Sequence, residues 1–135
     1  MERVITDAEL VDRFTERSIA PSAFGHREHV RLAFAVLARH PDFGVAAIAY
    51  RRMLRAFATA NGVPDRYHET ITWAYLAIVR ARMEGHAESD AMLAANPDLL
   101  DHRHGALARH YDVAAITADP FARRLFVLPA GREAR

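Results

Sequence analysis

The sequence predicts an all-α fold, a single compact bundle of about five to seven helices, and three observations carry that prediction. The chain has 135 residues, the length of one domain and enough to bury a core without disulfides. Apolar residues make up 51% of it and recur at helical spacing along several segments. Glycine and proline are few, and most of them fall between those segments. We expect one helical domain over residues 1–135, with residues 126–135 as an irregular C-terminal tail.

The first half of the chain contains three predicted helices. Thr6 and Asp7 have the residue types that start a helix, and the apolar face of a short helix follows them. The second helix runs from about His26 to Arg39. The third covers residues 45–62 and ends at Asn61-Gly62, a pair typical of a helix C-terminus.

The second half contains the strongest helical pattern, DRYHETITWAYLAIVRARM at residues 65–83. A shorter helix is expected over residues 89–96, and another over residues 99–111. Asp119-Pro120 has the composition of a cap and first position for a last short helix. We expect the tail to pack through two apolar side chains, Phe126 and Leu128.

Composition and charge exclude several functions. The formal net charge is +1, and the 18 basic residues are all arginines spread along the chain, unlike the basic block of a nucleic-acid-binding protein. The absence of lysine and cysteine removes Schiff-base chemistry, thiolate nucleophiles and cysteine-ligated metals. The N-terminus lacks the layout of a signal peptide, and no apolar run approaches the length of a membrane span. We therefore expect a cytoplasmic protein that acts on a small-molecule substrate, binds neither nucleic acid nor membrane, and is compatible with a homodimer.

Two histidines open the second predicted helix. At 100° per residue, His26 and His29 share one stripe with apolar residues, whereas Arg31 and Ala35 fall on the opposite side. Side chains three apart on a helix are neighbours, with Cβ atoms about 5–6 Å apart, so both imidazoles can reach one ion. The spacing therefore makes them a candidate metal pair.

A third histidine, His68, opens the apolar stripe of the helix predicted over residues 65–83. Burial and the positive end of a helix dipole both favour the neutral imidazole, which is the form that a metal ligand or general base requires. Two helices separated by one intervening helix run parallel in an up-down-up arrangement, which brings their starts together. His26, His29 and His68 are thus a candidate three-ligand metal site with an open fourth position. Zinc is the expected divalent ion, and nickel, iron and copper also suit imidazole.

Polar residues beside this trio are candidates for catalysis. Glu69 would act as general acid or base, or would orient a ligating imidazole, while Tyr67 and Thr72 would orient substrate. The first hypothesis is a metalloenzyme for hydrolysis, hydration or lyase-type elimination. The second is a metal-free acid–base isomerase or cyclase that uses His68 and Glu69. The third is a non-catalytic module that binds a ligand or partner, in which the histidines form a structural network.

A second group of histidines lies in DHRHGALARHY at residues 101–111. His102 and His104 are two apart, so on a helix they would point to different sides and could not easily chelate together. We interpret His102, His104 and His110 as a polar, solvated helix end. Asp101, His104 or His110 nevertheless remains a candidate for a fourth ligand. Aromatic residues at helical spacing are expected to fill the core.

Three segments carry a resemblance to a known group of proteins. They are F-G-H-R-E-H-V-R-L-A at residues 24–33, Y-H-E-T-I-T at residues 67–72, and A-R-R-L-F-V with a following proline at residues 122–129. The chain is similar to an uncharacterised family of small bacterial helical proteins that share F-x-H-x-x-H-[LV]-R-x-A and Y-H-E-T-x-T segments. The resemblance extends over most of the chain. It supports the same choice of residues and implies no particular reaction.

Overall fold

The computed structural model describes residues 5–129, and within that range every regular element is a helix. Seven α-helices are present in the described chain, which confirms the predicted fold class. They are α1 (Asp7–Thr15), α2 (His26–Arg39), α3 (Phe43–Ala60), α4 (Glu69–Arg82), α5 (Ser89–Ala95), α6 (Val113–Ala118) and α7 (Pro120–Arg124). Short 3-10 turns precede α2 and α4 and connect α5 to α6, at Pro21–Ala23, Pro64–Arg66, Pro97–Leu100 and Leu107–Arg109.

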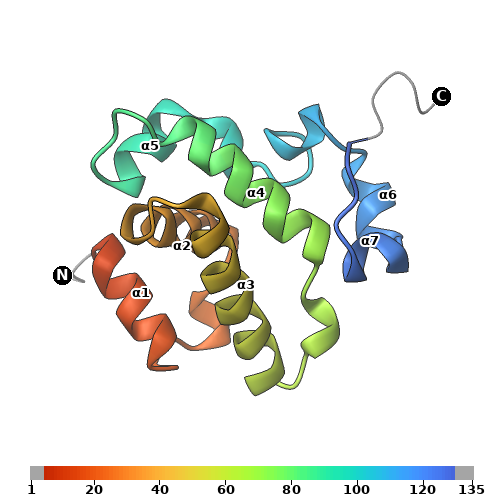
Figure 1. Cartoon of the computed structure of the whole chain (residues 1–135), viewed down its shortest axis with the longest axis horizontal. Helices are drawn as coiled ribbons and strands as arrows, with labels where there is room; N and C mark the ends of the chain where they lie inside the picture. The colour runs from red at the N-terminus through yellow and green to blue at the C-terminus, as the bar shows by residue number, and fades with distance from the viewer. Residues whose placement is uncertain (1–4, 130–135) are drawn as a thin grey trace.

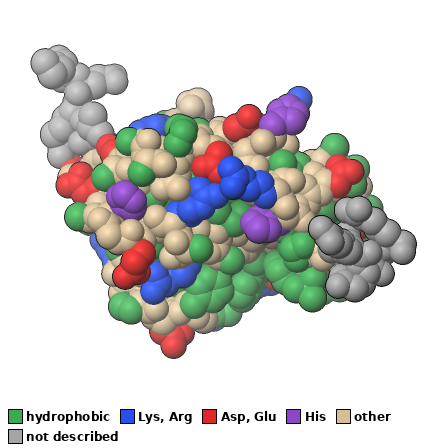
Figure 2. Space-filling view, turned by 90° about the horizontal axis from the view of Figure 1, so that it is seen from above, with side chains coloured by type: hydrophobic (Ala, Val, Ile, Leu, Met, Phe, Trp, Pro, Cys, Tyr) green, Lys and Arg blue, Asp and Glu red, His purple; other side chains and the backbone are tan. Residues whose placement is uncertain are grey.

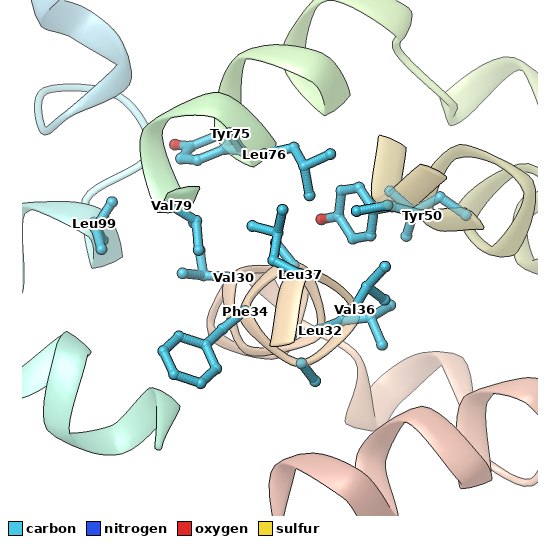
Figure 3. Packing of buried hydrophobic residues seen from close by; sticks show 14 of the residues in the cluster. Val30, Leu32, Phe34, Val36, Leu37, Tyr50, Tyr75, Leu76, Val79 and Leu99 are labelled. Atoms are coloured by element: carbon cyan, nitrogen blue, oxygen red, sulfur yellow. The ribbon is translucent and has the colours of Figure 1, made fainter. Parts of the chain in front are cut away.

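Helix α2 is the centre of the molecule. Figure 1 shows it surrounded by α1, α3, α4 and α5, all of which contact it, while α6 and α7 lie beside the start of α4. Every residue from Val30 to Leu37 is buried. Figure 3 looks along α2 and shows its apolar side chains leaving it in several directions, toward Tyr50 of α3 and Leu76 and Val79 of α4. The core is therefore arranged around one helix that is buried on all sides.

The side of α2 opposite the histidine stripe is also buried at its centre. Arg31 is only 7% exposed and Ala35 only 3%, because α1 and α5 cover them. The Arg31 guanidinium donates to the Ile5 carbonyl at 2.7 Å and to Ser89 Oγ at 3.1 Å, and it forms an ion pair with Asp7. A buried cation is tolerated here because its donors are satisfied.

The helix ends follow the capping rules that the sequence indicated. Thr6 caps α1 and forms a capping box with Glu9. Helix α2 has the predicted bounds, and α3 ends at Ala60 with Asn61 as its C-cap and Gly62 at φ +73°, the left-handed conformation that glycine accepts. Asp119 caps α7 at the predicted position.

The helix expected over residues 99–111 does not form. Two 3-10 turns and irregular chain occupy this segment, because the backbone folds back on itself at Gly105. A Cβ added to Gly105 would lie 2.0 Å from the carbonyl oxygen of Asp98 and 2.4 Å from that of Asp101, so only glycine fits. Helix α6, which follows, was not predicted from the sequence.

Residues 126–129 have no regular secondary structure, and the rest of the predicted tail lies outside the described residues. The expected packing through Phe126 and Leu128 is largely wrong, because these side chains are 46% and 78% exposed. Val127 packs against the core instead, and its backbone N–H donates to Thr70 Oγ1 at 3.1 Å. The Phe126 ring retains a contact with Trp73, with ring centroids 6.4 Å apart.

Charged side chains are interspersed on the face shown in Figure 2, where basic and acidic groups lie close together and histidines are scattered among them. Hydrophobic side chains gather on the lower part of the same face. Among residues 5–129, no helix combines the length and apolar character needed to cross a bilayer.

Candidate functional site

A cavity of about 610 Å³ opens where the starts of α2 and α4 meet α3 and the C-terminal segment. Four histidines line it, and only three of them belong to the predicted trio: His26, His29, His68 and His102. Three tyrosines also line it, namely Tyr50, Tyr67 and Tyr75. Apolar side chains supply much of the remaining wall, including Phe24, Leu54, Phe57, Val63 and Ile71. The cavity therefore combines an apolar interior with several ring nitrogens and hydroxyls.

His29 presents a ring nitrogen to this cavity in a fixed tautomer. Its Nδ1 lies 3.0 Å from the Gly25 carbonyl oxygen, which can only accept, so Nδ1 carries the proton and Nε2 carries the lone pair. Nε2 has no protein partner. Every buried side-chain nitrogen or oxygen of the described residues has a hydrogen-bond partner, so Nε2 is not buried. Because His29 lines the cavity, Nε2 is reachable from it. Burial lowers the pKa of His29 below the ordinary 6.5, and nearby His26 and His102 lower it further. His29 is thus a neutral imidazole with an accessible base.

His26 and His102 form a second polar group on the wall, together with Tyr75. His26 Nε2 donates to the Leu99 carbonyl at 2.8 Å, and its ring centroid lies 5.2 Å from that of His102. The Tyr75 hydroxyl lies 3.0 Å from His102 Nδ1. Burial lowers the pKa of His102 and raises that of Tyr75, so both groups stay neutral near pH 7. One of the two groups donates the hydrogen bond that joins them.

His68 has a structural role in this arrangement. It is the N-cap of α4 and lies just outside the first turn, where its Nδ1 accepts the backbone N–H of Ile71 at 3.1 Å. Its Nε2 donates to the Ile116 carbonyl at 2.8 Å and so ties α4 to α6. Burial lowers the pKa of His68, and both ring nitrogens are occupied by backbone partners. No lone pair is left for a metal ion while these hydrogen bonds are present.

The predicted metal set and the predicted catalytic set are therefore only partly brought together. His26, His29 and His68 line one cavity, as do Tyr67 and Thr72, but Glu69 does not. Among the described residues, no group of three or more histidine or carboxylate side chains is placed to hold a metal ion. The bonds of His68 do not fit a metal ligand, and the metal itself stays a prediction.

Glu69 is held beside the cavity wall by two partners. Its carboxylate forms an ion pair with Arg51 Nε at 3.0 Å and accepts the Tyr67 hydroxyl. The hydrogen bond to Glu69 and burial both raise the pKa of Tyr67, with burial the larger cause. Because the carboxylate is already engaged twice, Glu69 positions the Tyr67 ring and is not itself available to a ligand in the cavity.

His102 is the histidine that lines the cavity although the sequence does not predict it there. The sequence predicts a solvated helix end for it, together with His104 and His110, which are exposed. The turn at Asp101, whose carboxylate accepts the His104 N–H at 3.0 Å, instead directs His102 toward His26. The available signal was Gly105, since a glycine inside a short predicted helix also marks a tight turn.

The three segments that carry the family resemblance lie next to one another in space. Thr70 Oγ1, from the second segment, donates to the Ala122 and Leu125 carbonyls and accepts the Val127 N–H, all in the third segment. Arg123 Nη1, also in the third segment, donates to the Asp65 carbonyl at 2.9 Å just before the second. Helix α4 packs in turn against α2, which carries the first segment. Several of these motif residues therefore assemble the wall of the cavity.

No family model, curated protein or solved structure matches the chain.

Proposed function

We propose that the protein binds a small, mainly apolar organic molecule in this cavity and moves a proton on it, as an isomerase, a cyclase or an elimination enzyme would. His29 acts as the general base in this proposal. The observation that carries it is the fixed neutral tautomer of His29, with Nδ1–H held by the Gly25 carbonyl and Nε2 open to the cavity. An imidazole whose pKa is lowered by burial remains unprotonated and is ready to accept a proton near pH 7.

The His102–Tyr75 pair is the acid side of the proposed reaction. It lies on the same wall as His26, and the Tyr75 hydroxyl is 3.0 Å from His102 Nδ1. A substrate oxygen that gains negative charge as His29 removes a proton would be stabilised by a hydrogen bond from this pair. The apolar side chains around the cavity lower the local dielectric constant, which strengthens such a hydrogen bond.

This proposal keeps the acid–base chemistry expected from the sequence but moves it to other residues. His68 and Glu69, the pair first considered for it, are engaged with backbone and with Arg51. His29 and His102 retain ring nitrogens without protein partners. A metal-dependent reaction and a non-catalytic binding module remain distinct alternatives, and one experiment separates all three.

The test measures carbon-bound hydrogen exchange on a simple apolar ketone. Untagged protein is incubated with phenylacetone in D₂O, and deuterium uptake is followed by mass spectrometry against a protein-free blank. We expect acceleration by the wild type and its loss in His29→Gln. The matched control His104→Gln changes an exposed histidine outside the cavity and should keep the wild-type rate.

Three outcomes would overturn the proposal. Acceleration that persists in His29→Gln would remove His29 from the base role. Acceleration that requires added zinc, with one equivalent of metal found by elemental analysis, would support the metalloenzyme. Binding of phenylacetone, seen as shifts in the protein NMR spectrum, without any exchange would support a binding module.

A further inference from the structure

The charged side chains that line the cavity are all basic. Arg66 and Arg123 are among the lining residues, and no aspartate or glutamate is. Burial lowers the pKa of three of the four lining histidines, His29, His68 and His102, below the ordinary 6.5. The lining therefore carries the positive charges of two arginines and no carboxylate.

Acidic residues do lie near the cavity, but their carboxylates are turned to other partners. Glu28 accepts the Gly25 N–H, Asp101 accepts the His104 N–H, and Asp119 accepts the Phe121 N–H. Glu69 is paired with Arg51. These carboxylates cap backbone or neutralise a cation that does not line the cavity, so they leave the two lining arginines without an acidic partner inside it.

The Arg123 guanidinium lies against the backbone of the 3-10 turn that precedes α4 and carries Arg66. Arg123 Nη1 is 3.5 Å from the carbonyl oxygen of Arg66, and its Nη2 donates to the Thr117 carbonyl at 2.8 Å. These partners are neutral carbonyls, and no carboxylate of residues 5–129 forms an ion pair with Arg123. The Arg66 side chain is exposed and forms no hydrogen bond or ion pair within the described chain, while its backbone N–H donates to the Val63 carbonyl at 3.0 Å. Arg66 is consequently able to turn toward a ligand without breaking an existing contact.

The backbone also contributes positive electrostatic potential to the cavity. Helices α2 and α4, each of 14 residues, begin at the cavity, and the positive ends of their dipoles favour a negative charge there. The same lining includes the apolar side chains of Phe24, Leu54 and Phe57. The cavity thus combines positive charge with apolar surface.

We propose that the ligand of this cavity is a small carboxylate with an apolar or aromatic body. Its carboxylate binds Arg66 beside the positive charge of Arg123, and its body packs against the apolar side chains of Phe24 and Phe57. A planar carboxylate matches a guanidinium in charge and geometry. This inference rests on the proposed function, because it names the substrate class for the same cavity and places its carbon skeleton within reach of His29.

The experiment compares two probes of the same shape. Binding of 3-phenylpropionate and of its neutral amide, 3-phenylpropanamide, is measured by NMR titration at low salt. We expect the carboxylate to bind at least about fivefold more tightly and to weaken as sodium chloride is added, while the amide stays constant. Inorganic phosphate, which lacks an apolar body, should bind at least about fivefold more weakly than 3-phenylpropionate.

Two charge reversals locate the effect. Arg66→Glu should lower carboxylate affinity by about fivefold or more without changing amide affinity, because Arg66 has no structural partner to lose. Arg124→Glu makes the same charge change at an exposed position outside the cavity lining and should leave both affinities within about twofold.

The outcomes distinguish this inference from the proposed function. Equal binding of acid and amide, or an equal effect of the two reversals, overturns the carboxylate preference and leaves the cavity as a binding site. If phosphate binds as tightly as 3-phenylpropionate, the claim that the ligand has an apolar body is overturned. If neither organic probe shifts the cavity residues, the cavity is not a ligand site, and both the inference and the proposed function fail.

Discussion

Replacing Thr70 by valine tests how the wall of the cavity is held together. The Thr70 side chain is fully buried, and its hydroxyl donates to the Ala122 carbonyl at 2.7 Å and to the Leu125 carbonyl at 2.9 Å. It also accepts the Val127 N–H at 3.1 Å. Thr70→Val keeps the shape of the side chain and removes these three hydrogen bonds. The variant therefore loses hydrogen bonds while the packing of the side chain is kept.

The expected loss of unfolding free energy depends on whether water can replace the hydroxyl at each backbone group that Thr70 contacts. Ala122 is fully buried, so its carbonyl bears the whole cost of an unsatisfied group, about 1–3 kcal/mol. Leu125 is half exposed and Val127 is partly buried, so water replaces much of their loss. We expect Thr70→Val to lower the free energy of unfolding by about 2–3 kcal/mol.

The assay uses the single tryptophan of the chain. Trp73 contacts Phe126, so its fluorescence reports on the C-terminal segment during urea unfolding. The matched control is Thr15→Val, whose hydroxyl donates only to the Val11 carbonyl of its own helix, and we expect it to cost under about 1 kcal/mol. If Thr70→Val also costs less than about 1 kcal/mol, the C-terminal segment is not held by this hydroxyl and our account of the wall is wrong.

Three further predictions follow from the same contacts. Gly105→Ala should destabilise the protein by about 3 kcal/mol or more, measured by urea unfolding, because the new Cβ meets the Asp98 and Asp101 carbonyls; a loss below 1 kcal/mol would contradict this. The free energy of unfolding should fall as the pH drops below about 6.5, since burial lowers histidine pKa values and the unfolded chain then binds more protons; a flat profile between pH 7.5 and 5.5 would refute it. The lowered pKa values behind this prediction are those of His29, His68 and His102. Asp98→Asn should remove the bidentate ion pair with Arg82 and lower the melting temperature, whereas Glu84→Gln, at an exposed pair with Arg80, should not.

Local signals explain why most of the helices could be predicted. Thr6 and Asp119 have cap side chains and Gly62 has the left-handed conformation that ends a helix, and these features act within a few residues of the chain. The bounds of α2 and the end of α3 were therefore accessible from the sequence. Where a helix depends on distant partners, the pattern failed. Arg31 is buried because α1 and α5 cover it, which no wheel drawn for α2 alone can indicate.

The candidate site was predictable only in part, for a similar reason. Periodicity placed His26 and His29 on the inner side of α2, and the parallel arrangement of two helices brought His68 to the same cavity. The hydrogen bonds that decide each ring's role come from backbone far along the chain, such as the Ile116 carbonyl on His68. His102 reaches the cavity from an irregular turn, to which helical geometry does not apply.

The central claim is that His29 is a neutral base held in one tautomer at the cavity wall. The most direct test is a long-range ¹H–¹⁵N NMR spectrum of the histidine side chains, recorded at pH 7.5 and followed downward in pH, with assignments from His29→Gln. We expect His29 to show a protonated Nδ1, an unprotonated Nε2 and a pKa below 6.5. A proton on Nε2 at pH 7.5, or titration at or above 6.5, would contradict the account.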